Sequence, residues 1–223
     1  MKANIALIVV IFFSINCIQA QTSTFNKYKA FNGVAFEYTV LVPKDFDSNE
    51  TYKTIVSFAG VDRKDDASNT SITTLWKNHK NYNSIIIIAK VPVGESDWIS
   101  HPIHHGFNDF LKYIKTIYNV ENQKFHFLGY KGGCVPAQTY VSMLEYPAAS
   151  LTVLSSGYWD HYNEREYNRL AKLNIPINII YLANEEDGIK KGQQVVSMLI
   201  AKEAKVTLKV CKNFVTELNT YLQ

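Results

Sequence analysis

Short apolar runs alternate with amphipathic stretches from residue 35 to the end of this 223-residue chain. That alternation is typical of parallel strands joined by crossover helices, and it predicts an α/β fold. Segment 85–89 is apolar on both faces, so we expect it near the centre of a doubly wound sheet with helices on both sides. The expected strands are 35–42, 54–58, 85–91, 125–129, 151–155, 177–183 and 207–211.

Helices are expected in the gaps between these strands. The clearest is 107–118, where apolar residues recur at steps of three and four and form one stripe. Similar patterns cover 137–144 and 195–200, and a further helix is expected at 162–172. No linker, low-complexity tract or internal repeat divides the chain, so residues 21–223 are expected to form a single domain.

The first twenty residues have the layout of a signal peptide. Lys2 precedes an apolar run at 5–13, and the segment ends on the small residue Ala20. The apolar stretch is too short for a stable membrane span, and it is interrupted by Ser14 and Asn16. We therefore expect cleavage after Ala20 and a secreted or periplasmic protein.

The charge balance narrows the range of partners. The formal net charge of +3 comes from 23 basic and 20 acidic residues without a basic run. Such a balance does not indicate a nucleic-acid or anionic membrane partner.

Two cysteines lie beyond the signal peptide, Cys134 and Cys211, and two interpretations are open. They are either buried free thiols or a disulfide that an oxidising compartment permits.

One turn carries the strongest functional signal. The strand at 125–128 runs into Gly129-Tyr130-Lys131-Gly132-Gly133 and then directly into a helical pattern. In a nucleophile elbow, usually spelled G-x-S-x-G, the central residue is strained and its neighbours are minimal because two backbone segments pass close by.

Residues 120–133 resemble the nucleophile region of the α/β-hydrolase superfamily, and most closely its secreted esterase and polyhydroxybutyrate-depolymerase-like members. Segment 54–60 resembles the third strand and oxyanion turn of that family, and 181–187 resembles the strand and loop that carry the triad acid. The match covers about residues 35–210 and implies a mostly parallel sheet of seven to eight strands.

The resemblance assigns positions to individual residues. It puts Lys131 at the nucleophile position and Asp187 at the position of the triad acid. Because both lie at the same end of the sheet, the Lys131 ammonium is expected either to form an ion pair with Asp187 or to extend into water. The residues expected to line the ligand crevice are Gly60, Val61, Gly132, Trp98, Trp159 and Asp160. Asp160 has a second interpretation, as the cap of the helix at 162–172.

The departures from the family pattern concern catalysis. Lysine replaces the usual Ser, Cys or Asp at position 131, and Ala59 replaces the histidine of the oxyanion turn. No histidine follows Asp187, and the loop at 212–215 offers only Asn213. Acyl transfer needs a nucleophile, a base and oxyanion donors, so the sequence predicts a pseudo-hydrolase that binds a small molecule, peptide or protein.

Two catalytic alternatives are left open. One is a working carboxylic-ester hydrolase whose base comes from His101, His104 and His105 or from His161. The other is covalent chemistry of Lys131 with carbonyl compounds. The spacing of the three clustered histidines matches no zinc-ligand pattern, and neither a metal nor a cofactor is expected.

The tryptophans Trp98 and Trp159 either line a pocket for an apolar or sugar-like ligand or shield the sheet.

Overall fold

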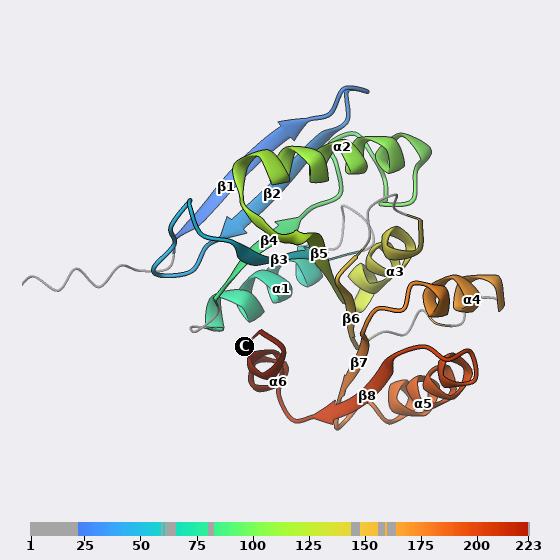
Figure 1. The fold of residues 1–223 in the computed structure, drawn as a ribbon. Coiled ribbons are helices and arrows are strands. Elements are labelled where there is room, and N and C mark those ends of the chain that lie inside the picture. Colours follow the sequence, from blue (N-terminus) through green and yellow to red (C-terminus); the bar gives the residue numbers. More distant parts are fainter. Residues whose placement is uncertain are drawn as a thin grey trace, which may run out of the picture.

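An eight-stranded sheet forms the centre of the molecule (Figure 1). The computed structural model describes residues 22–58, 60, 66–79, 83–143, 148–155, 159 and 164–222. Within them the strand order is β1-β2-β4-β3-β5-β6-β7-β8. The strands are β1 Ser23–Lys29, β2 Ala35–Leu41, β3 Tyr52–Phe58, β4 Ser84–Ala89, β5 Val120–Tyr130, β6 Ser150–Leu154, β7 Ile177–Leu182 and β8 Val206–Cys211.

The sheet is mostly parallel, as the sequence predicts. Only β1 and β2 run antiparallel to their neighbours, and every pairing from β4 through β3 to β8 is parallel. All seven predicted strands are present, with ends that differ by up to five residues. All six residues of β4 are buried, and β4 lies between β2 and β3, which confirms its predicted interior place.

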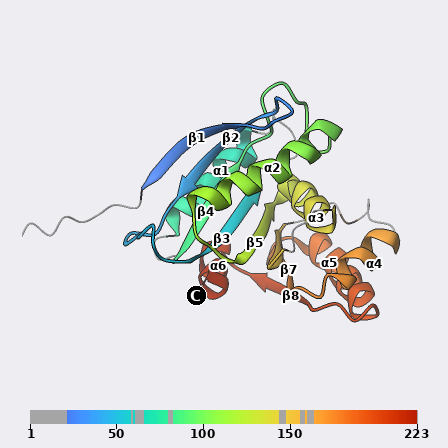
Figure 2. The ribbon, with the colours of Figure 1, turned by 45° about the horizontal axis from the view of Figure 1, so that its top comes forward.

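In the part of the chain that the structure describes, six α-helices cover the two faces of the sheet (Figure 2). Apolar side chains of α2, α3, α4 and α5 share one core cluster with one face, while α1 and α6 pack on the other. A parallel strand needs such cover on both sides because both of its faces are apolar. The helices are α1 Asp66–Asn78, α2 His101–Ile117, α3 Cys134–Met143, α4 Glu164–Lys172, α5 Glu186–Ile200 and α6 Phe214–Leu222.

The core beneath the carboxyl ends of the strands is aromatic. Phe58, the last residue of β3, meets Trp98 edge-on with ring centroids 4.9 Å apart. The hydroxyl of Tyr140 on α3 donates a hydrogen bond of 2.8 Å to the carbonyl of Trp98. These contacts fix the loop before α2 against α3.

Among the helices that the structure describes, none is both long enough and apolar enough to cross a membrane. The predicted signal peptide at residues 1–20 lies outside the described residues.

Candidate functional site

The bend after β5 has the geometry of a nucleophile elbow. Lys131 has a φ of 48°, in the left-handed region that L-residues with side chains rarely adopt. It begins a single 3₁₀ turn, Lys131–Gly133, that leads directly into α3. A Cβ on Gly129 would lie 2.4 Å from the Cα of Cys134 and 2.6 Å from the carbonyl oxygen of Gly133. The glycine is therefore required by the close approach of two backbone segments.

The side chain at the centre of this bend is exposed. The Lys131 ammonium lies 5.3 Å from the centroid of the Tyr130 ring, a cation–π contact. Of the carboxylates that the structure describes, none lies within 4.0 Å of this ammonium. No described histidine is hydrogen-bonded to it either.

Asp187 does not face Lys131, so the expected ion pair between them is wrong. The residue lies in the first turn of α5, and its side chain is 97% exposed. Its nearest cation is Lys190, one turn along the same helix, with Nζ 3.8 Å from Oδ1. The physical reason is that α5 begins at Glu186, which turns Asp187 outward to solvent.

Glu185 is the carboxylate that faces inward at the end of β7. Its Oε2 accepts a hydrogen bond of 2.8 Å from the Ser155 hydroxyl and one of 2.7 Å from the Leu182 amide. Ser155 follows β6 directly and also has a positive φ, of 53°. Glu185 cannot be singled out from the sequence, because it belongs to the run Glu185-Glu186-Asp187 and only the start of α5 decides which member points inward.

The loop after β8 contains no imidazole. In its place Asn213 accepts a hydrogen bond of 2.8 Å through Oδ1 from the amide of Val215, which satisfies a free donor at the start of α6. This is an N-cap interaction. Asn213 therefore has a structural role at the start of α6.

Both cysteines that the structure describes are free thiols, so of the two interpretations above the unpaired one holds. Cys134 is buried in the first turn of α3, and its Sγ lies 3.4 Å from the carbonyl oxygen of Leu154. Cys211, at the end of β8, is partly buried. Burial raises the pKa of the Cys211 thiol, and the carboxylates of Glu217 and Glu185 raise it further.

The histidine cluster lies on the first two turns of α2. The rings of His101 and His105 meet edge-on with centroids 4.9 Å apart, and both residues are exposed. His104 packs against Tyr140, and burial lowers the pKa of its imidazole, with smaller contributions from His101 and His105. Across the described segments, no group of three or more His, Cys, Asp or Glu side chains is placed to hold a metal ion.

The structure places the predicted binding residues in different surroundings. Gly60 and Gly132 are both buried, and Gly132 follows Lys131 in the elbow. Trp98 is a core residue rather than a pocket residue, because its 1% exposed side chain is enclosed by Phe58, Phe107 and Tyr140.

Trp159 stacks on Tyr167 with ring centroids 6.4 Å apart, and it lines a groove between α4 and α5. Val61 and Asp160 lie outside the described residues, as do Ala59 and His161.

Solved structures match nearly the whole chain, although no family model and no curated protein does. A ferulic acid esterase is 13% identical, with a TM-score of 0.62 over 91% of this chain and 96% of its own. The S-formylglutathione hydrolase FrmB from Staphylococcus aureus is 14% identical, with a TM-score of 0.57 over 91% and 96%. Dipeptidyl peptidase 4 from Porphyromonas gingivalis is 9% identical, with a TM-score of 0.64 over 91% of this chain and 35% of its own.

The strand order, the bend after β5 and these likenesses together define an α/β-hydrolase fold of the esterase type. At identities of 9 to 14%, the likenesses establish the fold and not the reaction.

Proposed function

We propose that this protein is a non-catalytic pseudo-hydrolase, exported from the cell, that uses the esterase-type fold to bind a ligand or partner. The observation that carries the proposal is the lysine at the elbow. Lys131 occupies the bend that would present a nucleophile, and its ammonium contacts the ring of Tyr130.

The other two catalytic positions support the same conclusion. Glu185 binds a hydroxyl and a backbone amide instead of an imidazole, and Asn213 caps α6. A serine hydrolase needs an imidazole between its acid and its nucleophile to move the proton. An acyl group on the Lys131 amine would form an amide, which does not turn over as an ester does.

The alternative is an active carboxylic-ester hydrolase with a relocated base. It would need an imidazole within hydrogen-bond reach of a nucleophile at the elbow. His101 and His105 contact each other on α2, and His161 remains a candidate for such a base. Kinetics separate this alternative from the proposal.

The test is multiple-turnover hydrolysis of p-nitrophenyl butyrate by the wild type and by Lys131→Ala. We expect both proteins to match the buffer rate. Lys124→Ala is the matched control, because Lys124 is an exposed lysine of β5, the strand that leads into the elbow. Turnover that is lost in Lys131→Ala and retained in Lys124→Ala would overturn the proposal in favour of the alternative.

Lysine covalent chemistry is tested separately, by borohydride trapping with a panel of aldehydes and ketones. The pseudo-hydrolase proposal expects no adduct at Lys131 in the peptide map. An adduct at Lys131 beyond the level at Lys124 would assign carbonyl chemistry to the elbow.

Export is tested by expressing the full chain in a bacterial host and determining the N-terminus of the protein recovered outside the cytoplasm. We expect a chain that begins at Gln21, because the small residue Ala20 ends the apolar segment. Recovery of an uncleaved chain in the membrane fraction would overturn this part of the proposal.

A further inference from the structure

Two exposed histidines, His101 and His105, stand one helical turn apart at the start of α2. Residues four apart on a helix lie on the same face, so their side chains can reach a common point. The two rings meet edge-on with centroids 4.9 Å apart. Among the residues that the structure describes, none is hydrogen-bonded or ion-paired to either imidazole. Each neutral ring therefore keeps one nitrogen lone pair that can bind a cation.

The separation of the two rings fits a chelate of a single metal ion. Imidazole nitrogens bind Zn²⁺ at about 2.0–2.1 Å, which places the ion about 3.2 Å from the centroid of each ring. For two rings with centroids 4.9 Å apart, the angle between them at the ion is about 100°. This angle lies between about 90° for a square-planar centre and about 109° for a tetrahedral one. Because both side chains are exposed, each ring can turn a nitrogen toward the ion without disturbing the core.

The third histidine of the cluster does not join the pair. His104 packs against Tyr140 with ring centroids 5.3 Å apart, and its Nε2 is buried. The described residues bring no third His, Cys, Asp or Glu ligand to the pair. It is therefore not a closed structural zinc site, which needs four protein ligands. An ion bound here would hold water at its other coordination positions, and such an ion exchanges with the solution.

Two carboxylates beside the start of α2 favour a cation at this place. The Glu95 carboxylate accepts a hydrogen bond of 2.7 Å from the hydroxyl of Ser100, the residue before His101. The Asp97 carboxylate accepts one of 2.8 Å from the amide of Ile99. Their negative charge opposes the positive end of the helix dipole, which would otherwise repel a cation bound to the first two turns.

We propose that His101 and His105 form a binding site for an exchangeable divalent transition-metal ion of the kind that prefers imidazole, such as Zn²⁺ or Ni²⁺. Imidazole nitrogen suits these ions, whereas Mg²⁺ and Ca²⁺ select oxygen ligands. Metal binding at this pair is independent of the pseudo-hydrolase proposal, because it uses neither Lys131 nor Glu185.

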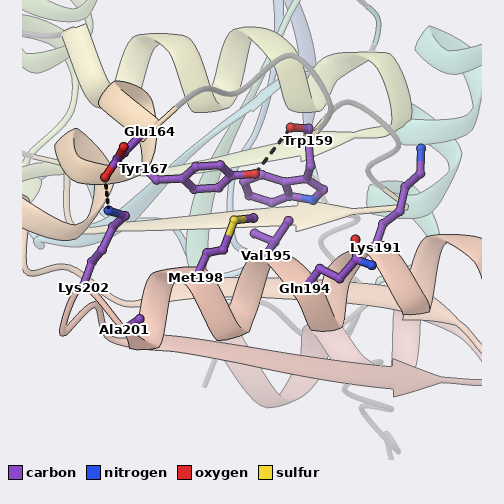
Figure 3. A pocket seen from close by; sticks show the side chains of 9 residues that line it. All are labelled: Trp159, Glu164, Tyr167, Lys191, Gln194, Val195, Met198, Ala201 and Lys202. Carbon is purple, nitrogen blue, oxygen red and sulfur yellow. Dashed lines mark hydrogen bonds and ion pairs between the residues drawn. The ribbon is translucent and has the colours of Figure 1, made fainter.

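Two sulfur atoms elsewhere in the described residues could attract the same ions. Cys211 is a partly buried free thiol at the end of β8. Met198 is a 40% exposed thioether in the groove between α4 and α5 (Figure 3). Cys211→Ser and Met198→Leu remove these donors with little change in side-chain volume, so they are the matched controls for the histidine variants.

The test is calorimetric titration of the untagged protein with NiCl₂ and with ZnCl₂, and MgCl₂ serves as the control salt. We expect Ni²⁺ and Zn²⁺ to bind, and Mg²⁺ not to bind at the same concentrations. His101→Asn and His105→Asn should each weaken binding about tenfold or more, since loss of a group that only orients a ligand already costs about 10–100-fold. Cys211→Ser and Met198→Leu should bind both ions like the wild type.

A second measurement locates the ion in the wild type, without any substitution. Paramagnetic Ni²⁺ broadens the proton signals of side chains near it, so the ring signals of His101 and His105 should broaden early in a ¹H NMR titration. Their absence from the spectra of the two histidine variants assigns these signals. The ring of His126 lies on the face of the sheet that α6 covers, and its signals should stay sharp.

Three results would contradict this site. The first is absence of binding at millimolar Ni²⁺ and Zn²⁺. The second is undiminished affinity in both His101→Asn and His105→Asn, and the third is loss of binding in Cys211→Ser or Met198→Leu, which would place the ion at sulfur. Each of these results leaves the esterase assay at the elbow unaffected.

Discussion

The carboxylate of Glu185 joins the ends of two neighbouring strands, because it accepts a hydrogen bond of 2.8 Å from Ser155 after β6. Its second bond, of 2.7 Å from the Leu182 amide, holds the turn that follows β7. The carboxylate of Glu185 therefore ties the loop after β6 to the turn after β7.

Replacing Glu185 by alanine should therefore destabilise the protein. Glu185→Ala removes both hydrogen bonds, and the free energy of unfolding should fall by about 1–3 kcal/mol. Urea denaturation measures the change. Asp187→Ala is the control, and because that side chain is 97% exposed its effect should stay within about 0.5 kcal/mol. Equal losses in the two variants would contradict the structural role of Glu185.

The left-handed backbone at Lys131 predicts a stabilising substitution. A non-glycine residue in this region costs about 1–2 kcal/mol, whereas glycine adopts it freely. Lys131→Gly should therefore be about 1 kcal/mol more stable to urea than Lys131→Ala. Both variants lack the lysine side chain, so their difference isolates the backbone. A Lys131→Gly protein no more stable than Lys131→Ala would show that position 131 is unstrained.

The sequence predicts seven of the eight strands of the described sheet and misses β1. β1 reads Ser-Thr-Phe-Asn-Lys-Tyr-Lys, and none of its seven residues is buried. It forms because its whole length pairs with β2, from Ser23 opposite Leu41 to Lys29 opposite Ala35. Such an edge strand is held by its backbone pairing with the neighbouring strand rather than by burial of its side chains, so hydrophobic periodicity does not reveal it.

In the candidate site, too, contacts with other parts of the chain decide the roles of single residues that the local sequence does not specify. The glycine pattern around Lys131 predicts the elbow, and at Gly129 the close approach of Gly133 and Cys134 leaves no room for a side chain. The choice between Glu185 and Asp187 depends on the residue at which α5 begins, and helix boundaries are poorly specified by local sequence. The choice between the two interpretations of Trp98 depends on its enclosure by Phe58 and Tyr140, which come from distant segments.

Gly129 should be the least replaceable glycine of the elbow. In Gly129→Ala the new methyl would meet backbone atoms of Gly133 and Cys134 at 2.4–2.7 Å, and the backbone cannot move aside as a side chain can. We expect a loss of about 3 kcal/mol or more in thermal or urea unfolding. In the control Gly106→Ala, the methyl meets only side-chain atoms at 3.1–3.3 Å, and a smaller loss is expected.

His126 predicts a loss of stability in mild acid. Its Nδ1 lies 2.7 Å from the Ser150 hydroxyl oxygen, on the face of the sheet that α6 covers. Burial, together with a smaller effect of the charge of Lys53, lowers the pKa of this imidazole to about 4. The unfolded chain therefore binds a proton at a higher pH than the folded protein does.

The stability that neutral His126 contributes is complete above the unfolded pKa of about 6.5 and is lost as the pH falls toward 4. The loss should amount to about 3 kcal/mol between pH 7 and pH 4, measured as the free energy of unfolding in urea at each pH. In His126→Gln the free energy of unfolding should fall by about 3 kcal/mol less between pH 7 and pH 4 than it does in the wild type. This difference does not depend on the stability of the variant at pH 7. The buried imidazoles of His79 and His104 also have lowered pKa values and are present in both proteins, so they cancel in the comparison. Parallel pH profiles for the wild type and His126→Gln would mean that His126 is as accessible to protons in the folded protein as in the unfolded chain.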